Sequence, residues 1–374
     1  MNGSIENSTM LNSAAAKCIP FTLETRVFTK AIKATCYTAL MLLSLLGNAA
    51  VIATVAKNRH MWTTTNYLIA NMAVSDLLLS TFAVPREMAE IFIGFRGWLI
   101  DGLAGAILCK VVYFFQDIST AVSIQSIVVI TLDRYTGVVQ PFREPLVTPK
   151  RLKFVIALIW LISMGLHGIY FYVARHQRVN EISICSFSFE PAFDNLQSLR
   201  INFIILSVFL IAIPLSVIAV LYSLILRDLR RKKPFWQKSS SLLVKNRRKE
   251  DTKIVRNVLA IIILFVICIL PIDIVGFLFF FVWYEEIPCG MDQLSFAAKF
   301  IFYSNASFNP YIYFLLNDRY RQGLRNIFNP NGKAKECYPR EEDISGIEMN
   351  EVWFMKIFHS PQWVAFYQYT VILK

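Results

Sequence analysis

Several ionisable side chains lie in or beside long apolar stretches of the chain. They are Asp76, Asp133, Arg134, Asp273 and Lys299. A charged group at membrane depth is costly unless it faces an opposite charge, a bound ion or water, so these residues indicate ion pairing, ion binding or ligand binding. The Ser, His and Asp residues show no nucleophile arrangement, and no phosphate-binding loop or zinc-ligand spacing occurs. We therefore expect a binding protein and no enzyme.

The elements that position these side chains are apolar segments of membrane-spanning length. The 374-residue chain is 55% hydrophobic and only 17% charged, which is too apolar for one soluble core of this size. We predict an all-α membrane protein: a seven-helix transmembrane bundle at 31–316 and an amphipathic helix on the inner leaflet at 317–328. Residues 1–30 form an extracellular segment, and residues 329–374 form a cytoplasmic tail. The predicted spans are 31–56, 64–93, 106–132, 152–174, 199–226, 255–283 and 294–316.

The third span is expected to carry function at both ends. Residues 109–135 are predicted to form one helix that begins at Cys109 and ends at Asp133-Arg134-Tyr135. At 1.5 Å per residue this helix is roughly 40 Å long, about a bilayer with its interfaces. Its two ends therefore lie on opposite sides of the membrane.

The positive charges predict the orientation of the chain. With the amino terminus outside, the basic residues gather in the inward connections, as the positive-inside rule requires. They are Lys57, Arg59, Arg143, Lys150, Arg151, Lys153, the block from Arg227 to Arg256, Arg319, Arg321 and Arg325. The net charge of +12 thus indicates topology and attraction to anionic membrane lipid, not nucleic-acid binding. Glycosylation sequons at Asn2 and Asn7 lie in the segment expected outside.

Landmark residues in all seven spans carry a resemblance to a known family. Cys109 precedes Arg134 by 25 positions, and the last span ends in Asn309-Pro310-Tyr311-Ile312-Tyr313. Other landmarks are Gly47-Asn48, Met72-Ala73-Val74-Ser75-Asp76, Trp160, and Pro214 with Tyr222. Over residues 31–328 the chain resembles the rhodopsin-like (class A) G protein-coupled receptors. The resemblance implies a plasma-membrane receptor that binds an extracellular ligand and activates a heterotrimeric G protein, with arrestin and receptor kinases as further partners.

The resemblance also implies a disulfide and an ion site. A bond between Cys109 and Cys185 would hold the second outer loop over the bundle mouth. Cys18 and Cys289 are both expected outside as well, and a second bridge between them stays open. No cofactor is required, but the family implies an allosteric sodium ion. The residues implied for the sodium site are Asp76, Ser123, Asn305 and Asn309.

The inner end of the third span is the expected switch for G-protein coupling. Arg134 can pair with its neighbour Asp133, and the family implies a resting contact to an acidic residue at the start of the sixth span. Counting twenty positions back from Pro271 gives Asp251. In the family, activation moves the sixth span outward and frees the arginine. The residues implied in this switch are Asp133, Arg134, Tyr135, Tyr222, Asp251 and Tyr313.

A packing switch is expected between the ligand pocket and this inner end. Pro214, Ile124 and Phe265 match the family's residues for it. Ile269, however, stands where the family usually has a tryptophan. The usual aromatic trigger is absent, so the switch must use different packing.

The upper part of the bundle excludes some ligand classes. Opsins hold retinal on a lysine at the position of Tyr303, and amine receptors use an aspartate at the position of Gln116. Light and small biogenic amines are therefore disfavoured. A glutamine at that position resembles many neuropeptide receptors, so a peptide ligand is expected.

Acidic residues at the outer ends of the spans suggest a basic peptide. Glu87 and Glu90 lie at the top of the second span and would attract positive charge. An ordinary solvated surface is the alternative, because Arg86 and other arginines lie in the same layer.

Two ionisable residues are expected deeper in the pocket. Asp273 could hold an arginine or an amidated peptide end, whereas Lys299 could hold a carboxylate. Lys299 could instead pair with Asp273 or with Asp117. A receptor for a lipid or small carboxylate that uses Lys299 is therefore the alternative function.

The second outer loop is expected to form a lid. Residues Ser183 to Phe189 alternate small polar and apolar side chains, which predicts a strand that forms a hairpin with the residues before it. A transporter or channel remains a remote alternative, which the lack of visible inverted repeats disfavours.

Overall fold

The computed structural model describes residues 23–328, apart from 95, 141–142, 180–181, 239–241 and 284–287. Only the backbone is described at 23–26, 232–238 and 242–251. The predicted glycosylation sites Asn2 and Asn7, and Cys18, lie outside the described residues. Cys289 is disulfide-bonded.

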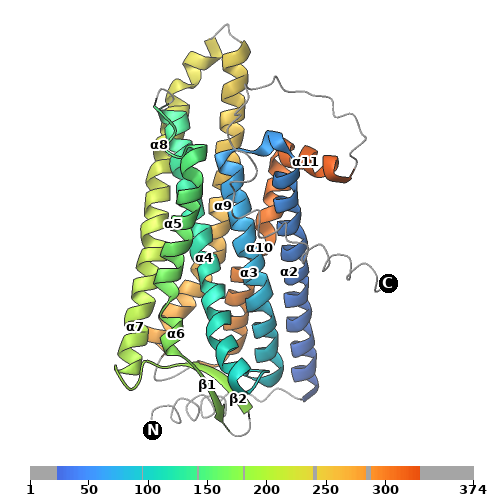
Figure 1. The fold of residues 1–374 in the computed structure, drawn as a ribbon, viewed down its shortest axis with the longest axis vertical. Coiled ribbons are helices and arrows are strands. Elements are labelled where there is room, and N and C mark those ends of the chain that lie inside the picture. Colours follow the sequence, from blue (N-terminus) through green and yellow to red (C-terminus); the bar gives the residue numbers. More distant parts are fainter. Residues whose placement is uncertain are drawn as a thin grey trace.

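Long helices run side by side along the longest axis of the molecule (Figure 1). They are α2 (Leu23–Lys57), α3 (Thr64–Ile93), α4 (Gly102–Val139), α5 (Pro149–His167) with α6 (Tyr170–Val173), α7 (Asn195–Leu206) with the π-helix η2 (Ser207–Ala212) and α8 (Ile213–Lys238), α9 (Leu242–Phe281) and α10 (Met291–Leu316). The strands β1 (Ala174–Val179) and β2 (Ile182–Phe187) lie at one end of the bundle, which we call the outer end. The short helix α11 (Asp318–Phe328) lies across the opposite, inner end, and the 3-10 helix η1 (Arg59–Met61) joins α2 to α3.

The helices have the length and composition of membrane spans. Within the described residues, six helical segments are long and apolar enough to cross a bilayer. The 26-residue α10 is also long enough, but Lys299, Asn305 and Asn309 make it more polar. It packs against α2, α3 and α9, which shields these polar groups from lipid. The predicted all-α membrane bundle is confirmed, with one added hairpin outside the spans.

Some helix ends differ from the predicted ones because of local caps. The third span was predicted to begin at Cys109, but it begins at Gly102. The Asp101 carboxylate caps this end, because it accepts a hydrogen bond from the Gly102 N–H at 3.0 Å. The same bond lowers the pKa of Asp101 below its usual value. The sixth span begins at Leu242, well before the predicted residue 255. Its basic first turns therefore extend beyond the apolar part of the helix.

The predicted outer hairpin is confirmed. Strands β1 and β2 pair antiparallel, with Ala174 opposite Phe187 and Val179 opposite Ile182. Gly97 in the preceding loop forms an isolated bridge to Ile184, so the first outer loop joins the edge of the hairpin.

The fifth span contains a feature that the sequence analysis did not predict. Six residues, Ser207–Ala212, form a π-helix just before Pro214. Proline has no N–H to donate to the preceding turn, and a wider turn is one way in which a helix accommodates it. The extra residue in the turn changes which side chains of the outer half face the bundle.

Two glycines permit close packing of α2 against α10 and α11. A Cβ at Gly47 would lie 2.9 Å from the Pro310 Cβ, so its absence lets α2 approach α10. A Cβ at Gly323 would lie 2.7 Å from the Thr54 Cγ2, so α11 docks directly on α2. On the apolar face of the predicted amphipathic helix α11, Tyr320 is fully buried and stacks on Tyr313, with ring centroids 5.6 Å apart, while Phe328 at the end of the helix is 81% exposed.

Candidate functional site

Four charged side chains near the outer end of α3 and α10 form a closed ring of ion pairs, which we call the outer ion ring. Arg86 contacts Glu87 and also Glu90, the latter at 2.8 Å. Lys299 contacts the other oxygen of each carboxylate, Glu87 at 3.0 Å and Glu90 at 3.1 Å. The two positive and two negative charges balance, which is what burial in a low-dielectric interior requires.

The ring corrects two expectations about these residues. Lys299 was expected to hold a ligand carboxylate or, alternatively, to pair with Asp273 or Asp117, but in the structure it pairs with the two glutamates of α3. Glu87 was expected at an exposed acidic rim, but its side chain is only 4% exposed. The predicted attraction of these glutamates for a basic ligand is therefore already satisfied from within the protein.

Arg86 is the member that sequence reasoning missed, since it was assigned to the solvated outer layer. Its guanidinium donates to Gln116 Oε1 at 3.1–3.2 Å and to the Tyr303 hydroxyl at 3.2 Å, and lies 4.7 Å from the Tyr113 ring centre. The available signal was its spacing, because Arg86 and Glu90 are four residues apart on one helix face.

Two other carboxylates have only neutral partners. Asp117 accepts hydrogen bonds from the Tyr170 hydroxyl and from the Gln116 amide, the latter at 3.2 Å. Asp273 accepts one from the Ser207 hydroxyl at 2.6 Å, at the start of the π-helix. Neither forms an ion pair with a side chain that the structure describes. These are the acidic groups of the upper bundle whose charge is not cancelled by a direct partner.

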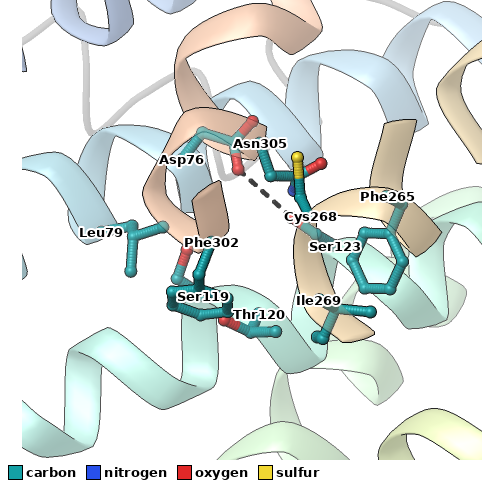
Figure 2. Close-up of a pocket in the computed structure, with 10 residues that line it drawn as sticks. All are labelled: Asp76, Leu79, Ser119, Thr120, Ser123, Phe265, Cys268, Ile269, Phe302 and Asn305. Atoms are coloured by element: carbon teal, nitrogen blue, oxygen red, sulfur yellow. Dashed lines mark hydrogen bonds between the residues drawn. The ribbon is translucent and has the colours of Figure 1, made fainter. Parts of the chain in front are cut away.

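A small cavity of about 10 Å³, room for one water-sized group, lies below this layer, between α3, α4, α9 and α10 (Figure 2). Asp76, Ser123 and Asn305 line its polar side, and Ser123 donates to Asp76 Oδ1 at 3.4 Å. Asn309 donates to the other carboxylate oxygen at 3.1 Å. The structure therefore brings together all four residues named for the sodium site.

The donor set of the cavity suits a hard monovalent cation. The Asp76 carboxylate supplies negative charge, and the buried Oδ1 of Asn305 has no hydrogen-bond partner among the described residues. Oxygen ligands of this kind are those that hard cations prefer. No group of three or more His, Cys, Asp or Glu residues in the described part of the chain could hold a transition metal.

The apolar side of the same cavity includes the position that lacks the family's tryptophan. Ile269 and Phe265 line it, and both are almost fully buried. Ile124 and Phe265 belong to one hydrophobic cluster of the bundle, and Pro214 in the fifth span is buried as well. With isoleucine at this position, the aromatic rings of this wall of the cavity come from Phe265 and Phe302 instead.

At the inner end, Arg134 forms an ion pair with Asp133. Asp133 also accepts a hydrogen bond from Thr65 at 3.3 Å, and Tyr135 packs at the edge of the hydrophobic core. The side chain of Asp251, the expected resting partner of Arg134, lies outside the described side chains. The pairing to Asp133 alone is therefore established.

Three contacts hold the inner part of α9 against the bundle. The Tyr222 hydroxyl donates to the Val255 carbonyl at 3.3 Å. Asn257 donates to the Leu316 carbonyl at 3.3 Å, and Lys253 pairs with Asp318 at 3.5 Å. Tyr313 lies nearby, with its hydroxyl 4.0 Å from the Met72 sulfur. An outward movement of α9 would have to break the first three of these contacts.

The outer hairpin is held to the bundle by a disulfide. Cys109 and Cys185 are bonded across 76 residues of sequence, as the family resemblance implied. Backbone hydrogen bonds from Cys185 to Arg96 and from Trp98 to Ser183, at 3.0 and 2.8 Å, fix the first outer loop to β2. The lid is therefore anchored at its centre to α4.

Comparison with known proteins gives a consistent family. The sequence pattern described as 7 transmembrane receptor (rhodopsin family) matches residues 47–313. Neuromedin-U receptor 2 from Rattus norvegicus is 27% identical over 81% of this chain and 76% of its own length. The substance-K receptor of Homo sapiens is 30% identical over 80% and 73%, and neuropeptide FF receptor 1 of Homo sapiens is 29% identical over 81% and 72%.

Proposed function

The chain belongs to the rhodopsin family of seven-transmembrane receptors, and from this premise we propose that it binds an extracellular peptide and activates a heterotrimeric G protein. It is a multi-pass membrane protein and not an enzyme, and the family match contradicts the transporter or channel alternative. The proposal includes a plasma-membrane location with the amino terminus outside.

The observation that carries the peptide proposal is the range of relatives. Receptors named for neuromedin U, substance K and neuropeptide FF are 27–30% identical to this chain over about four fifths of its length. Three differently named peptide receptors at similar distance favour a peptide ligand over the other ligand classes of the family.

The charges favour a basic peptide over the alternative ligand, a lipid or small carboxylate. A carboxylate would have to draw Lys299 away from two glutamates that it already contacts at 3.0 and 3.1 Å. A cationic group, in contrast, finds Asp117 and Asp273 without a directly paired cation among the described side chains.

A screen of amidated peptides on transfected cells, with calcium and cyclic AMP as readouts, tests this proposal. For the active peptide, Asp273→Asn should lower potency about tenfold to a hundredfold, because a charge-assisted hydrogen bond contributes about 1.5–3 kcal/mol. Glu190→Gln changes an exposed outer carboxylate and is the matched control, expected to leave potency nearly unchanged. Responses to fatty or carboxylate compounds alone would refute the peptide ligand.

The cavity at Asp76 is proposed to hold a sodium ion, supported by the unpartnered Asn305 oxygen. Sodium should then raise the thermal stability of the purified receptor relative to a bulky organic cation. The expected gain is about 1.4 kcal/mol at ten times the dissociation constant. Asp76→Asn should remove the dependence on sodium, and an unchanged sodium effect in that variant would contradict the site.

A further inference from the structure

The outer ion ring treats its two cations differently. Arg86 has a side chain only 5% exposed and makes additional hydrogen bonds to Gln116 and Tyr303. Lys299 is 28% exposed, and its hydrogen bonds within the described residues go only to Glu87 and Glu90. Arg86 is therefore a fixed part of the interior, whereas Lys299 is the cation that solvent and ligands can reach.

A buried hydroxyl beside the ring is left without a partner. Tyr37 is 1% exposed, and its hydroxyl makes no hydrogen bond to any described residue. Its ring packs edge-on against Tyr303, at 5.9 Å between centroids, and the Tyr303 hydroxyl in turn donates to Glu87 at 2.9 Å. Leaving such a group unsatisfied is costly, so an acceptor is available here for an N–H donor that the described chain does not supply.

We infer that Glu87 and Glu90, with the Tyr37 hydroxyl, form a cation-binding site that Lys299 fills until an ammonium or guanidinium group of the ligand takes its place. The inference rests on the proposed function for the source of that group, a basic peptide. Exchange of one cation for another keeps the buried carboxylates paired throughout, which a neutral or anionic ligand cannot do.

The exchange has a mechanical result. Lys299 is on α10 and both glutamates are on α3, so the two contacts tie these helices together near the outer end. A ligand cation that replaces Lys299 releases α10 from α3 while leaving Arg86 and its hydrogen bonds in place. Ligand binding would thereby change a contact between spans while the two buried carboxylates stay paired, and the displaced Lys299 ammonium would turn to solvent, to which its side chain is already 28% exposed.

The site can be tested without knowing the ligand, by thermal unfolding of the purified full-length receptor in lipid nanodiscs. The probes are butylammonium and arginine amide, with butyrate as the anionic control. Lys299→Ala should unfold at a lower temperature than wild type, and millimolar butylammonium or arginine amide should raise its midpoint by about 2–4 °C. Wild type should respond much less, because its own lysine competes, and butyrate should have no effect on either protein.

A charge-balanced variant separates site binding from general effects of the probes. Arg86→Met/Glu87→Gln/Glu90→Gln/Lys299→Ala removes both positive and both negative charges of the ring, so it stays neutral, lacks both carboxylates and should not respond to either cation. An equal response in this variant, no response in Lys299→Ala, or stabilisation of wild type by butyrate would each overturn the inference. If Lys299→Ala does not accumulate, growth with butylammonium should restore its surface level, and failure to do so counts against the site. The unfolding measurement uses neither a peptide nor a G protein. A negative peptide screen would therefore count against the proposed function but not against the cation site.

Discussion

Replacing Arg86 by methionine is expected to cost about 3–5 kcal/mol of stability and to remove most of the folded receptor from the cell surface. Arg86 contacts both glutamates of the outer ion ring, and its loss leaves two carboxylates for the single charge of Lys299. Glu87 is too buried for water to replace the lost guanidinium. Because domains are stable by about 5–15 kcal/mol, such a loss is a large fraction of the total.

Surface labelling and the unfolding temperature in detergent check this expectation. Arg178→Met is the matched control, since Arg178 also pairs with an aspartate but its side chain is 63% exposed and should cost less than about 1 kcal/mol. Arg86→Met/Glu90→Gln restores the charge balance as a Glu87–Lys299 pair, so it should recover much of the loss. A fully stable Arg86→Met protein would show that the ring is not a structural element.

Removing the disulfide by Cys109→Ser is the second change with a large expected effect. The bond closes a loop of 76 residues, for which loop-closure entropy gives about 4.5 kcal/mol. Part of this is not realised if the spans keep their helices in the unfolded state, so the figure is an upper bound. The outer hairpin would also lose its only covalent link to α4 among the described residues, so the binding of an extracellular ligand should weaken.

Unfolding temperature and ligand binding measure the two consequences separately. Cys36→Ser alters a free, half-buried cysteine and should change either quantity little. Reduction of wild type with dithiothreitol also breaks the bond at Cys289, so its effect should be at least as large as that of Cys109→Ser. Equal stability and binding before and after reduction would contradict a structural role for the bond.

The fold could be predicted from the sequence to a large extent because its signals are local. Apolar runs of spanning length, the basic inward connections and the alternating pattern of Ser183 to Phe189 each act within one segment. The helix start at Gly102 was missed although its signal is also local, since Asp101-Gly102 is a capping sequence that the apolar pattern outweighed.

The partners of the interior charges could not be predicted in the same way. Periodicity places Lys299 on a helix face, but its partners depend on how α10 is rotated against α3. The partner Glu87 on α3 is more than 200 residues away from Lys299 in the sequence. Asp273 meets Ser207 at the start of a π-helix, and that turn sets which residues of the fifth span face inward. Tertiary packing determines which residues become the partners of Lys299 and Asp273, and it cannot be predicted from the pattern of one segment alone.

The connectivity of the outer ion ring has one more consequence. Four ion pairs join its four charged side chains, and each side chain takes part in two of them. If any one ion pair breaks, every side chain still has at least one partner. If one charged residue is replaced by a neutral one, the charges no longer balance. The ring therefore tolerates motions that break one contact at a time and is intolerant of mutations that remove a residue. Thermal motion can therefore break any one of the contacts without separating the charges, whereas almost any substitution of Arg86 leaves the two carboxylates with too little positive charge.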